Sequence, residues 1–137
     1  MSKYIEKAKE LRAITDVHYN CAQSVLVPFA KEMGMTEEQA YNLGYNFGAG
    51  MKRGSVCGAV TAGLMVTAGL MVMGMLGIND TKDLQAYHNA IKGNHDGYLD
   101  CRDLLASSAK KGEDKKAHCD GMVYEAVKLV EEFMAKK

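Results

Sequence analysis

Apolar positions recur at helical spacing along almost the whole chain, and no segment shows the strict alternation of a half-buried strand. The first predicted helix covers residues 2–14 and the last covers 119–135. In the last helix, one face carries Met122, Val123, Ala126, Val127, Val130 and Phe133. The pattern predicts an all-α fold, with about six to seven helices packed as a bundle.

Capping residues and glycines set the expected limits of the other helices. Asn20 is a good N-cap for a second helix that ends at Met33, before Gly34. Thr36 and Gln39 form a capping-box pair at the start of a third, which we expect to continue to Lys52. We expect a fourth helix over 56–76, capped by Ser55, and a fifth that Asp80 or Thr81 opens and that ends in the 93–97 turn. A short sixth helix is expected from Asp100 through Leu105, followed by a solvent loop over 107–116.

The fourth predicted helix is the least polar part of the chain. Residues 54–79 carry no charge and are rich in glycine, alanine and methionine, and the segment is long enough to span a bilayer. The flanking helices, however, are amphipathic and each needs an apolar partner. Gly44 and Gly48 would let the third helix lie close against it. We therefore interpret this segment as the central helix of the bundle, not as a membrane anchor. An exposed Gly/Met-rich surface on it would favour a homodimer.

Length and charge narrow the functional classes. The 137 residues are expected to form one domain, residues 1–137. Seventeen basic residues balance seventeen acidic ones, which argues against nucleic-acid binding because such proteins usually carry a basic excess. The charged, amphipathic N-terminal segment lacks the features of a secretory signal. We therefore expect a cytoplasmic location, where thiols are kept reduced.

The four cysteines are the strongest candidates for chemistry. Each falls at or near a predicted helix start, where unpaired N–H groups and the helix dipole stabilise a thiolate. If the helices alternate in direction, three of the cysteines gather at one end of the bundle, and the loop over 107–116 is long enough to return the fourth to that end. The four residues are Cys21, Cys57, Cys101 and Cys119.

The cysteine spacings of 36, 44 and 18 residues include no CxxC pair, which removes zinc-ribbon and thioredoxin-type motifs. Two chemistries remain open for these four residues. Two or more thiols can cycle to a disulfide, as in a thiol–disulfide oxidoreductase, or all four thiolates can hold an iron–sulfur cluster or another thiophilic metal. In the structural alternative, one or two of the cysteines have no chemical role and are only small buried side chains.

Neighbouring charges rank the four thiols. Lys52 and Arg53 precede Cys57, and we expect this cationic pair to make it the most reactive thiol. His118, beside Cys119, is a candidate proton donor or further ligand. The sequence carries no catalytic triad, phosphate loop or nucleotide motif, and it does not identify a redox partner.

The contexts of the four cysteines resemble a known family. The segments Asn20-Cys21-Ala22-Gln23-Ser24, Gly48-Ala49-Gly50, Cys57-Gly58-Ala59, Cys101-Arg102-Asp103-Leu104-Leu105 and the final Cys119 are similar, in order, to those of the bacterial and archaeal family named C_GCAxxG_C_C. The resemblance covers nearly the whole chain. It implies a helical fold, redox activity that rests on the cysteines, and an anaerobic source.

The chain departs from the family pattern at one position. The central motif is expected to read CGAxxG, but Ala62 stands at its last position and the next glycine is Gly63. If the family's glycine serves close helix contact, alanine is small enough to replace it. If the family's glycine instead makes room for a cofactor or substrate, Ala62 argues against such binding in this chain. We favour the packing interpretation.

Overall fold

The computed structural model describes residues 2–77 and 81–135, and these residues form seven α-helices and no named strand. The predicted all-α fold is therefore confirmed. The helices are α1 (Lys3–Ala13), α2 (Cys21–Leu26), α3 (Glu37–Gly44), α4 (Gly58–Val72), α5 (Thr81–Asn94), α6 (Cys101–Lys110) and α7 (Lys115–Ala135), with two short 3-10 helices, η1 (Val27–Phe29) and η2 (Tyr45–Phe47).

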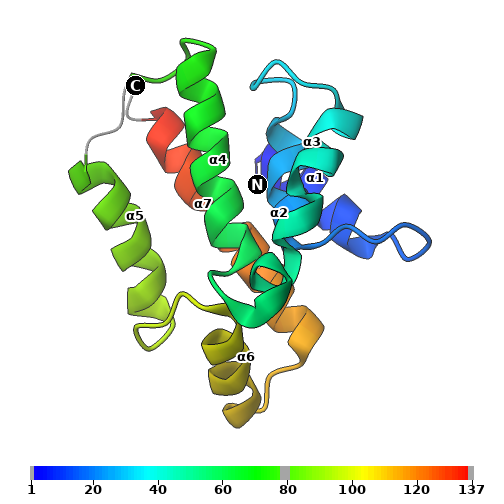
Figure 1. Cartoon of the computed structure of the whole chain (residues 1–137), viewed down its shortest axis with the longest axis vertical. Helices are drawn as coiled ribbons and strands as arrows, with labels where there is room; N and C mark the ends of the chain where they lie inside the picture. The colour runs from blue at the N-terminus through cyan, green and yellow to red at the C-terminus, as the bar shows by residue number, and fades with distance from the viewer. Residues whose placement is uncertain (1, 78–80, 136–137) are drawn as a thin grey trace.

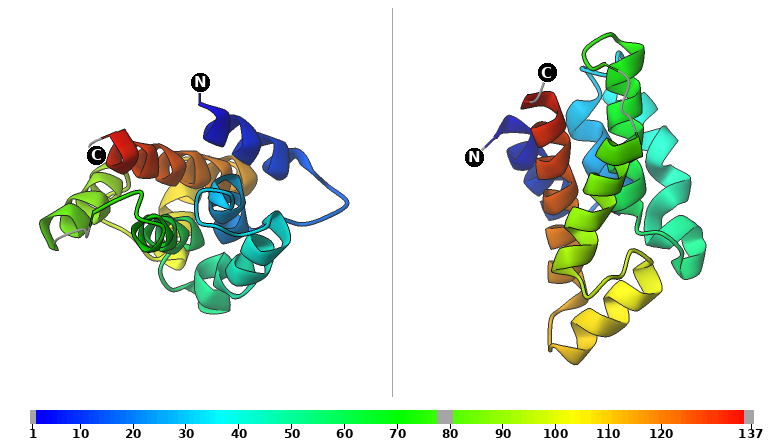
Figure 2. Two further views of the ribbon diagram at one scale, coloured as in Figure 1. Left: turned by 90° about the horizontal axis from the view of Figure 1, so that it is seen from above. Right: turned by 90° about the vertical axis from the view of Figure 1, so that its left-hand side faces the viewer.

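Helices α2, α4 and α7 pack against one another and form the centre of the bundle (Figure 1). All three run upward from their first residues in this view, and α6 lies below the ends at which they begin. The view from above in Figure 2 shows α1 against α7 on one side of this centre. The fully buried apolar side chains of these three helices include Ala22, Val25, Leu26, Ala59, Val60, Ala62, Val66, Leu70, Val123, Val127 and Val130.

Helix α4 is the central apolar helix that the sequence predicts, but it is shorter than expected. It ends at Val72, and the side chains of Val72 and of the C-cap residue Met73 are exposed. Among the residues that the structure describes, no helix is both long and apolar enough to cross a membrane.

A buried polar pair joins α2 to α3. The side chain of Asn20 caps α2 by accepting from the backbone N–H of Gln23, whose side chain accepts in return from the Asn20 N–H, both at 2.8 Å. The Asn20 amide also donates to the carbonyls of Gly44 and Tyr45, at 3.4 and 3.2 Å, and Gln23 donates to that of Tyr41 at 3.0 Å. One residue pair thus caps the start of α2 and the end of α3.

The sequence predicted that the third helix would continue to Lys52, and this prediction is wrong. Helix α3 ends at Gly44. The carbonyls at its end accept hydrogen bonds from the side chains of Asn20 and Gln23, and the chain tightens there into the 3-10 helix η2. Beyond η2 the chain turns sharply: Ala49, Met51 and Lys52 all have positive φ, which non-glycine residues rarely adopt. Such angles are incompatible with a continuing α-helix.

Two further expectations for this region are wrong. Ser55 does not cap α4; Cys57 occupies the N-cap position, and Ser55 is extended. Gly44 and Gly48 do not face α4 either. A Cβ atom on Gly48 would lie 2.6 Å from the Asn20 amide, and one on Gly44 would lie 2.9 Å from Leu26. Both glycines therefore allow the chain to approach α2.

The loop predicted over 107–116 is much shorter in the structure. Helix α6 continues past Leu105 to Lys110, and Ser108 on this extension is buried. Helix α7 begins at Lys115, where Asp114 accepts from the Ala117 N–H at 3.2 Å and so caps it. Asp100 stands at the N-cap position of α6 without a side-chain hydrogen bond. Thr81 opens α5 as predicted, and the alternative, Asp80, lies outside the described residues.

Gly63 receives a buried side chain from α5. The Tyr87 hydroxyl donates to the Val60 carbonyl at 2.8 Å, and a Cβ on Gly63 would lie 2.1 Å from that hydroxyl. Ala62, at the departing motif position, is fully buried in the core. Both observations favour the packing interpretation of this motif.

Candidate functional site

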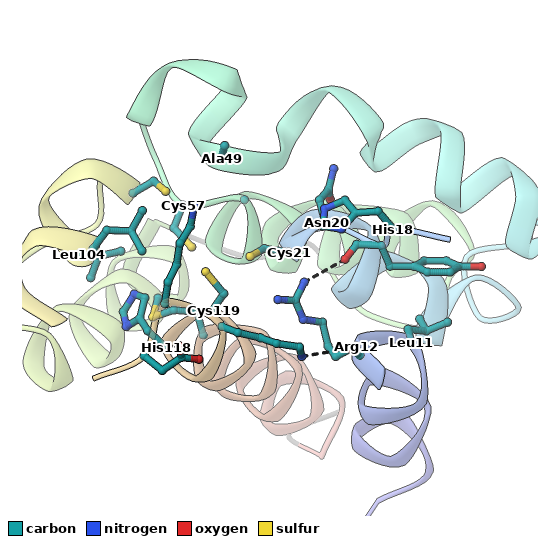
Figure 3. A pocket seen from close by; sticks show the side chains of 18 of the residues that line it. Leu11, Arg12, His18, Asn20, Cys21, Ala49, Cys57, Leu104, His118 and Cys119 are labelled. Atoms are coloured by element: carbon teal, nitrogen blue, oxygen red, sulfur yellow. Dashed lines mark hydrogen bonds between the residues drawn. The ribbon is translucent and has the colours of Figure 1, made fainter. Parts of the chain in front are cut away.

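The four cysteines line a single pocket of about 570 Å³ at the end of the bundle where the central helices begin. All four are free thiols; Cys57 is buried and the other three are partly exposed. Figure 3 shows the side chains of Cys21, Cys57 and Cys119 pointing toward the same space. The expected convergence of the cysteines is thus confirmed.

Backbone contacts bring the starts of three helices together. The Cys57 N–H donates to the Leu99 carbonyl at 2.9 Å, and the Cys101 N–H donates to the Ser55 carbonyl at 2.7 Å. This pair of bonds flanks an antiparallel bridge between Val56 and Asp100 and holds the start of α6 against that of α4. Gly58 brings α4 to α2, because a Cβ there would lie 2.5 Å from the Phe47 carbonyl and 3.3 Å from the Ala22 nitrogen.

The expectation that all four cysteines begin helices is wrong for one of them. Cys21 and Cys101 are the first residues of α2 and α6, and Cys57 is the N-cap of α4. Cys119 is instead the fifth residue of α7, because Asp114 and Lys115 start that helix earlier than predicted. A thiolate on Cys119 therefore owes its stability to neighbouring side chains.

Cys21 and Cys119 form a hydrogen-bonded thiol pair. The hydrogen bond from Cys21 lowers the pKa of Cys119 to about 7; burial opposes this shift, and the positive charges of Arg12 and Lys115 assist it. The same bond, together with burial, raises the pKa of Cys21 well above its ordinary value. Near neutral pH the pair therefore shares one proton, with the negative charge on Cys119 and the proton on Cys21.

Arg12 supplies a positive charge that lowers the pKa of both thiols of this pair. Its Nε donates to Asp120 at 2.6 Å and its Nη1 donates to the Tyr19 carbonyl at 2.9 Å. The side chain is only 10% exposed, so its charge is poorly screened by solvent. In Figure 3 the guanidinium lies beside Cys21 and Cys119. The charge of Arg12 favours the thiolate form of both cysteines.

Cys57 does not have the electrostatic setting that the sequence predicted for it. Burial raises its pKa to about 11, although the first-turn amides of Ala59 and Val60 partly offset the effect. Lys52 is directed away, with its ammonium 5.0 Å from the centre of the Tyr45 ring. The pKa of Cys101 is raised by burial and by Cys119, and Lys115 opposes the rise. Neither thiol is set up to ionise near neutral pH.

Two of the histidines also line the pocket, namely His18 and His118. His118 is buried and packs edge-on against His95, with ring centres 6.1 Å apart. Burial, followed by the proximity of His95, lowers the pKa of His118, so its ring is neutral at pH 7. His95 in turn contacts Glu125 at 2.7 Å. His118 therefore borders the pocket as a neutral, tightly packed side chain.

The mouth of the pocket is charged and its floor is apolar. Asp114, Lys115 and Lys116 are exposed lining residues at the start of α7, whereas Leu104 and Met122 are buried. Within residues 2–77 and 81–135, no three or more histidine, cysteine, aspartate or glutamate side chains are arranged as a group that could hold a metal ion.

Sequence reasoning missed the charged residues around the cysteines. Arg12 and Asp120 are 108 positions apart, and no local pattern links them. One weak signal exists: Arg12 is the only arginine in a first helix whose other basic residues are lysines, and arginine is preferred where a buried cation binds several acceptors. Lys115 was assigned to a solvent loop, so its place at the pocket was not expected.

The fold and the site define an all-helical protein with four free cysteines around one pocket. Residues 19–133 match the family model described as "Putative redox-active protein (C_GCAxxG_C_C)". Since the match covers most of the chain, the protein belongs to this family. No curated protein and no solved structure matches the chain.

Proposed function

We propose that this protein is a dithiol–disulfide redox protein in which Cys119 and Cys21 are the redox-active pair. The observation that carries the proposal is their hydrogen-bonded contact, which favours a Cys119 thiolate at neutral pH beside a protonated Cys21. The thiolate is the form of cysteine that attacks a disulfide. This assignment moves the most reactive thiol from Cys57 to Cys119.

Each residue of the pair has a distinct role in the proposed cycle. The Cys119 thiolate attacks a disulfide substrate and forms a mixed disulfide, and the first half of the substrate leaves as a thiolate. Cys21 then gives up its proton and attacks the Cys119 sulfur, which forms the Cys21–Cys119 disulfide and releases the second half. Two electrons pass from the protein to the substrate. Two equivalents of a thiol reductant restore the dithiol by the same exchange steps run in the opposite direction, and leave as a disulfide.

Cys57 and Cys101 remain part of the proposed site because they line the same pocket, and a negative charge on Cys119 raises the pKa of both thiols. Their raised pKa values keep both thiols protonated near pH 7. We therefore assign them no attacking role in the first step. Both line the same pocket as the pair.

Peptide mapping after mild oxidation tests the pairing. Trypsin places the four cysteines in separate peptides, 13–31, 54–82, 93–102 and 117–128. After one equivalent of 2-hydroxyethyl disulfide, we expect peptides 13–31 and 117–128 to be joined. The Cys57→Ser/Cys101→Ser variant should form the same link, whereas Cys21→Ser should stop at a mixed disulfide on Cys119. A link confined to Cys57 and Cys101 in the native chain would contradict the proposal.

A second measurement distinguishes the proposed dithiol–disulfide chemistry from metal binding by the same four cysteines. Protein purified without oxygen is expected to show four titratable thiols and no visible absorption from thiolate-bound iron. Stoichiometric iron that blocks these thiols would favour a cluster held by the same four cysteines. Metal analysis and thiol titration on one sample distinguish the two chemistries.

A further inference from the structure

The pocket is larger than a thiol pair alone requires. Its volume of about 570 Å³ lies within the range, about 300–1,000 Å³, of pockets that hold small molecules. The buried side chains of Leu104 and Met122 provide apolar contact on its floor, and Cys119 borders the same space. A small ligand seated there would lie against the thiol that we propose as the nucleophile.

The charges around the pocket are not balanced. Three cations line it, Arg12, Lys115 and Lys116, against one carboxylate, Asp114. Asp120 lies alongside and pairs with both Arg12, at 2.6 Å, and Lys116, at 3.1 Å. Asp114 accepts from the backbone at the start of α7. Three cations and two carboxylates leave a net charge of plus one. Among the described residues, Lys115 has no ion-pair partner, whereas Arg12 and Lys116 both pair with Asp120.

The excess positive charge of the pocket is balanced at the start of the proposed reaction but not after its first step. While Cys119 is a thiolate, its negative charge offsets the excess. When Cys119 forms a mixed disulfide, that negative charge departs with the leaving thiolate, and the cations of the pocket are left without compensation. A substrate that carries its own negative charge would replace the lost one at this step.

We propose that the pocket binds small disulfides that carry carboxylate groups, and that Lys115 binds the carboxylate of the half that stays attached to Cys119. This inference rests on the proposed function, because it requires Cys119 to be the attacking thiol. In this half-reaction one anionic disulfide is reduced to two thiols while Cys21 and Cys119 are oxidised to a disulfide. Electrons and sulfur atoms balance without a further reactant.

Three aliphatic disulfides of similar length and different charge test the inference. They are 3,3′-dithiodipropionate (anionic), 2-hydroxyethyl disulfide (neutral) and cystamine (cationic). Each rate with the reduced, full-length protein is divided by the rate of the same disulfide with N-acetylcysteine amide, a neutral thiol, so that intrinsic reactivity cancels. At low ionic strength we expect the anionic disulfide to react faster than the cationic one by a factor on the order of ten, with the gap closing as salt is added.

Variants at Lys115 separate ligand binding from a general effect on the thiol. Lys115→Gln should narrow the gap between the anionic and cationic disulfides, and Lys115→Arg should restore it. Lys110→Gln serves as the matched control, because Lys110 is an exposed residue of α6 that does not line the pocket. A change in thiolate content alone would slow all three disulfides equally and leave their ratio unchanged.

The outcomes distinguish failure of this inference from failure of the proposed function. Equal normalised rates for the three disulfides, with modification at Cys119, would overturn the substrate class and leave the Cys21–Cys119 pair intact. Modification that falls first on another cysteine would overturn the proposed function as well. A Lys115-dependent preference for the anionic disulfide at Cys119 would support both.

Discussion

At the scale of single residues, the site depends on a few contacts around Cys119. Cys21 donates a hydrogen bond to it, and Arg12 contributes a positive charge that is held in place by Asp120 and the Tyr19 carbonyl. Cys57 lies in the same pocket but is buried, so its pKa is high. The four thiols therefore differ in pKa because their immediate surroundings differ, and not only because of their positions at helix starts.

The Arg12 charge has a testable consequence. Arg12→Gln removes a cation that favours the thiolate, so we expect the alkylation rate of Cys119 at pH 7 to fall, with its pH midpoint shifted upward. Arg12→Lys keeps the charge and should retain more of the rate, although it loses the two-point attachment. Site-resolved mass spectrometry measures both. An unchanged midpoint in Arg12→Gln would show that Arg12 does not tune this thiol.

At the scale of elements, the Asn20–Gln23 pair sets where α2 starts and α3 ends. Local signals predicted the Asn20 cap, and the structure confirms it. They did not predict that the same side chains would bond to the last carbonyls of α3, since those contacts join residues 18 to 25 positions apart. The helix predicted to continue to Lys52 therefore ends eight residues early.

This double role predicts unequal costs for two similar capping substitutions. Thr36→Ala removes an exposed cap of α3 and should cost about 1 kcal/mol of unfolding free energy. Asn20→Ala removes a cap and also removes the hydrogen bonds from the Asn20 amide to the carbonyls of Gly44 and Tyr45, so it should cost about 2–3 kcal/mol. Urea unfolding measures both values. Equal costs would contradict the shared-cap description.

At the scale of the whole molecule, the sequence predicted the fold class, the central position of α4 and the gathering of the cysteines. These follow from periodicity and from the order of helix starts along the chain. The path between α3 and α4 was not predictable from local rules, because Ala49, Met51 and Lys52 adopt positive φ only in their tertiary setting. The Arg12–Asp120 contact likewise depends on α1 packing against α7.

The contact between α5 and α4 gives a prediction at the same scale. Gly63→Ala would place a methyl group where the Tyr87 hydroxyl lies and should cost about 2–3 kcal/mol. Tyr87→Phe loses only the hydrogen bond to Val60 and should cost about 1 kcal/mol. The double variant should lose less than the sum, because removal of the hydroxyl makes room for the methyl group. Additive losses in urea unfolding would contradict this packing.

The central claim is that Cys119, among four cysteines in one pocket, is the thiol that ionises near neutral pH. Reduced protein kept without oxygen is alkylated with iodoacetamide between pH 5.5 and 9.5, and the rate at each cysteine is read from its own tryptic peptide. We expect Cys119 to react first, with a midpoint near pH 7, and Cys57 to stay almost unlabelled across this range. Cys21→Ala should raise the Cys119 midpoint, whereas Cys21→Ser, which keeps a hydrogen-bond donor, should raise it less. Uniform labelling of all four cysteines with midpoints above pH 8, or Cys57 reacting first, would contradict the account.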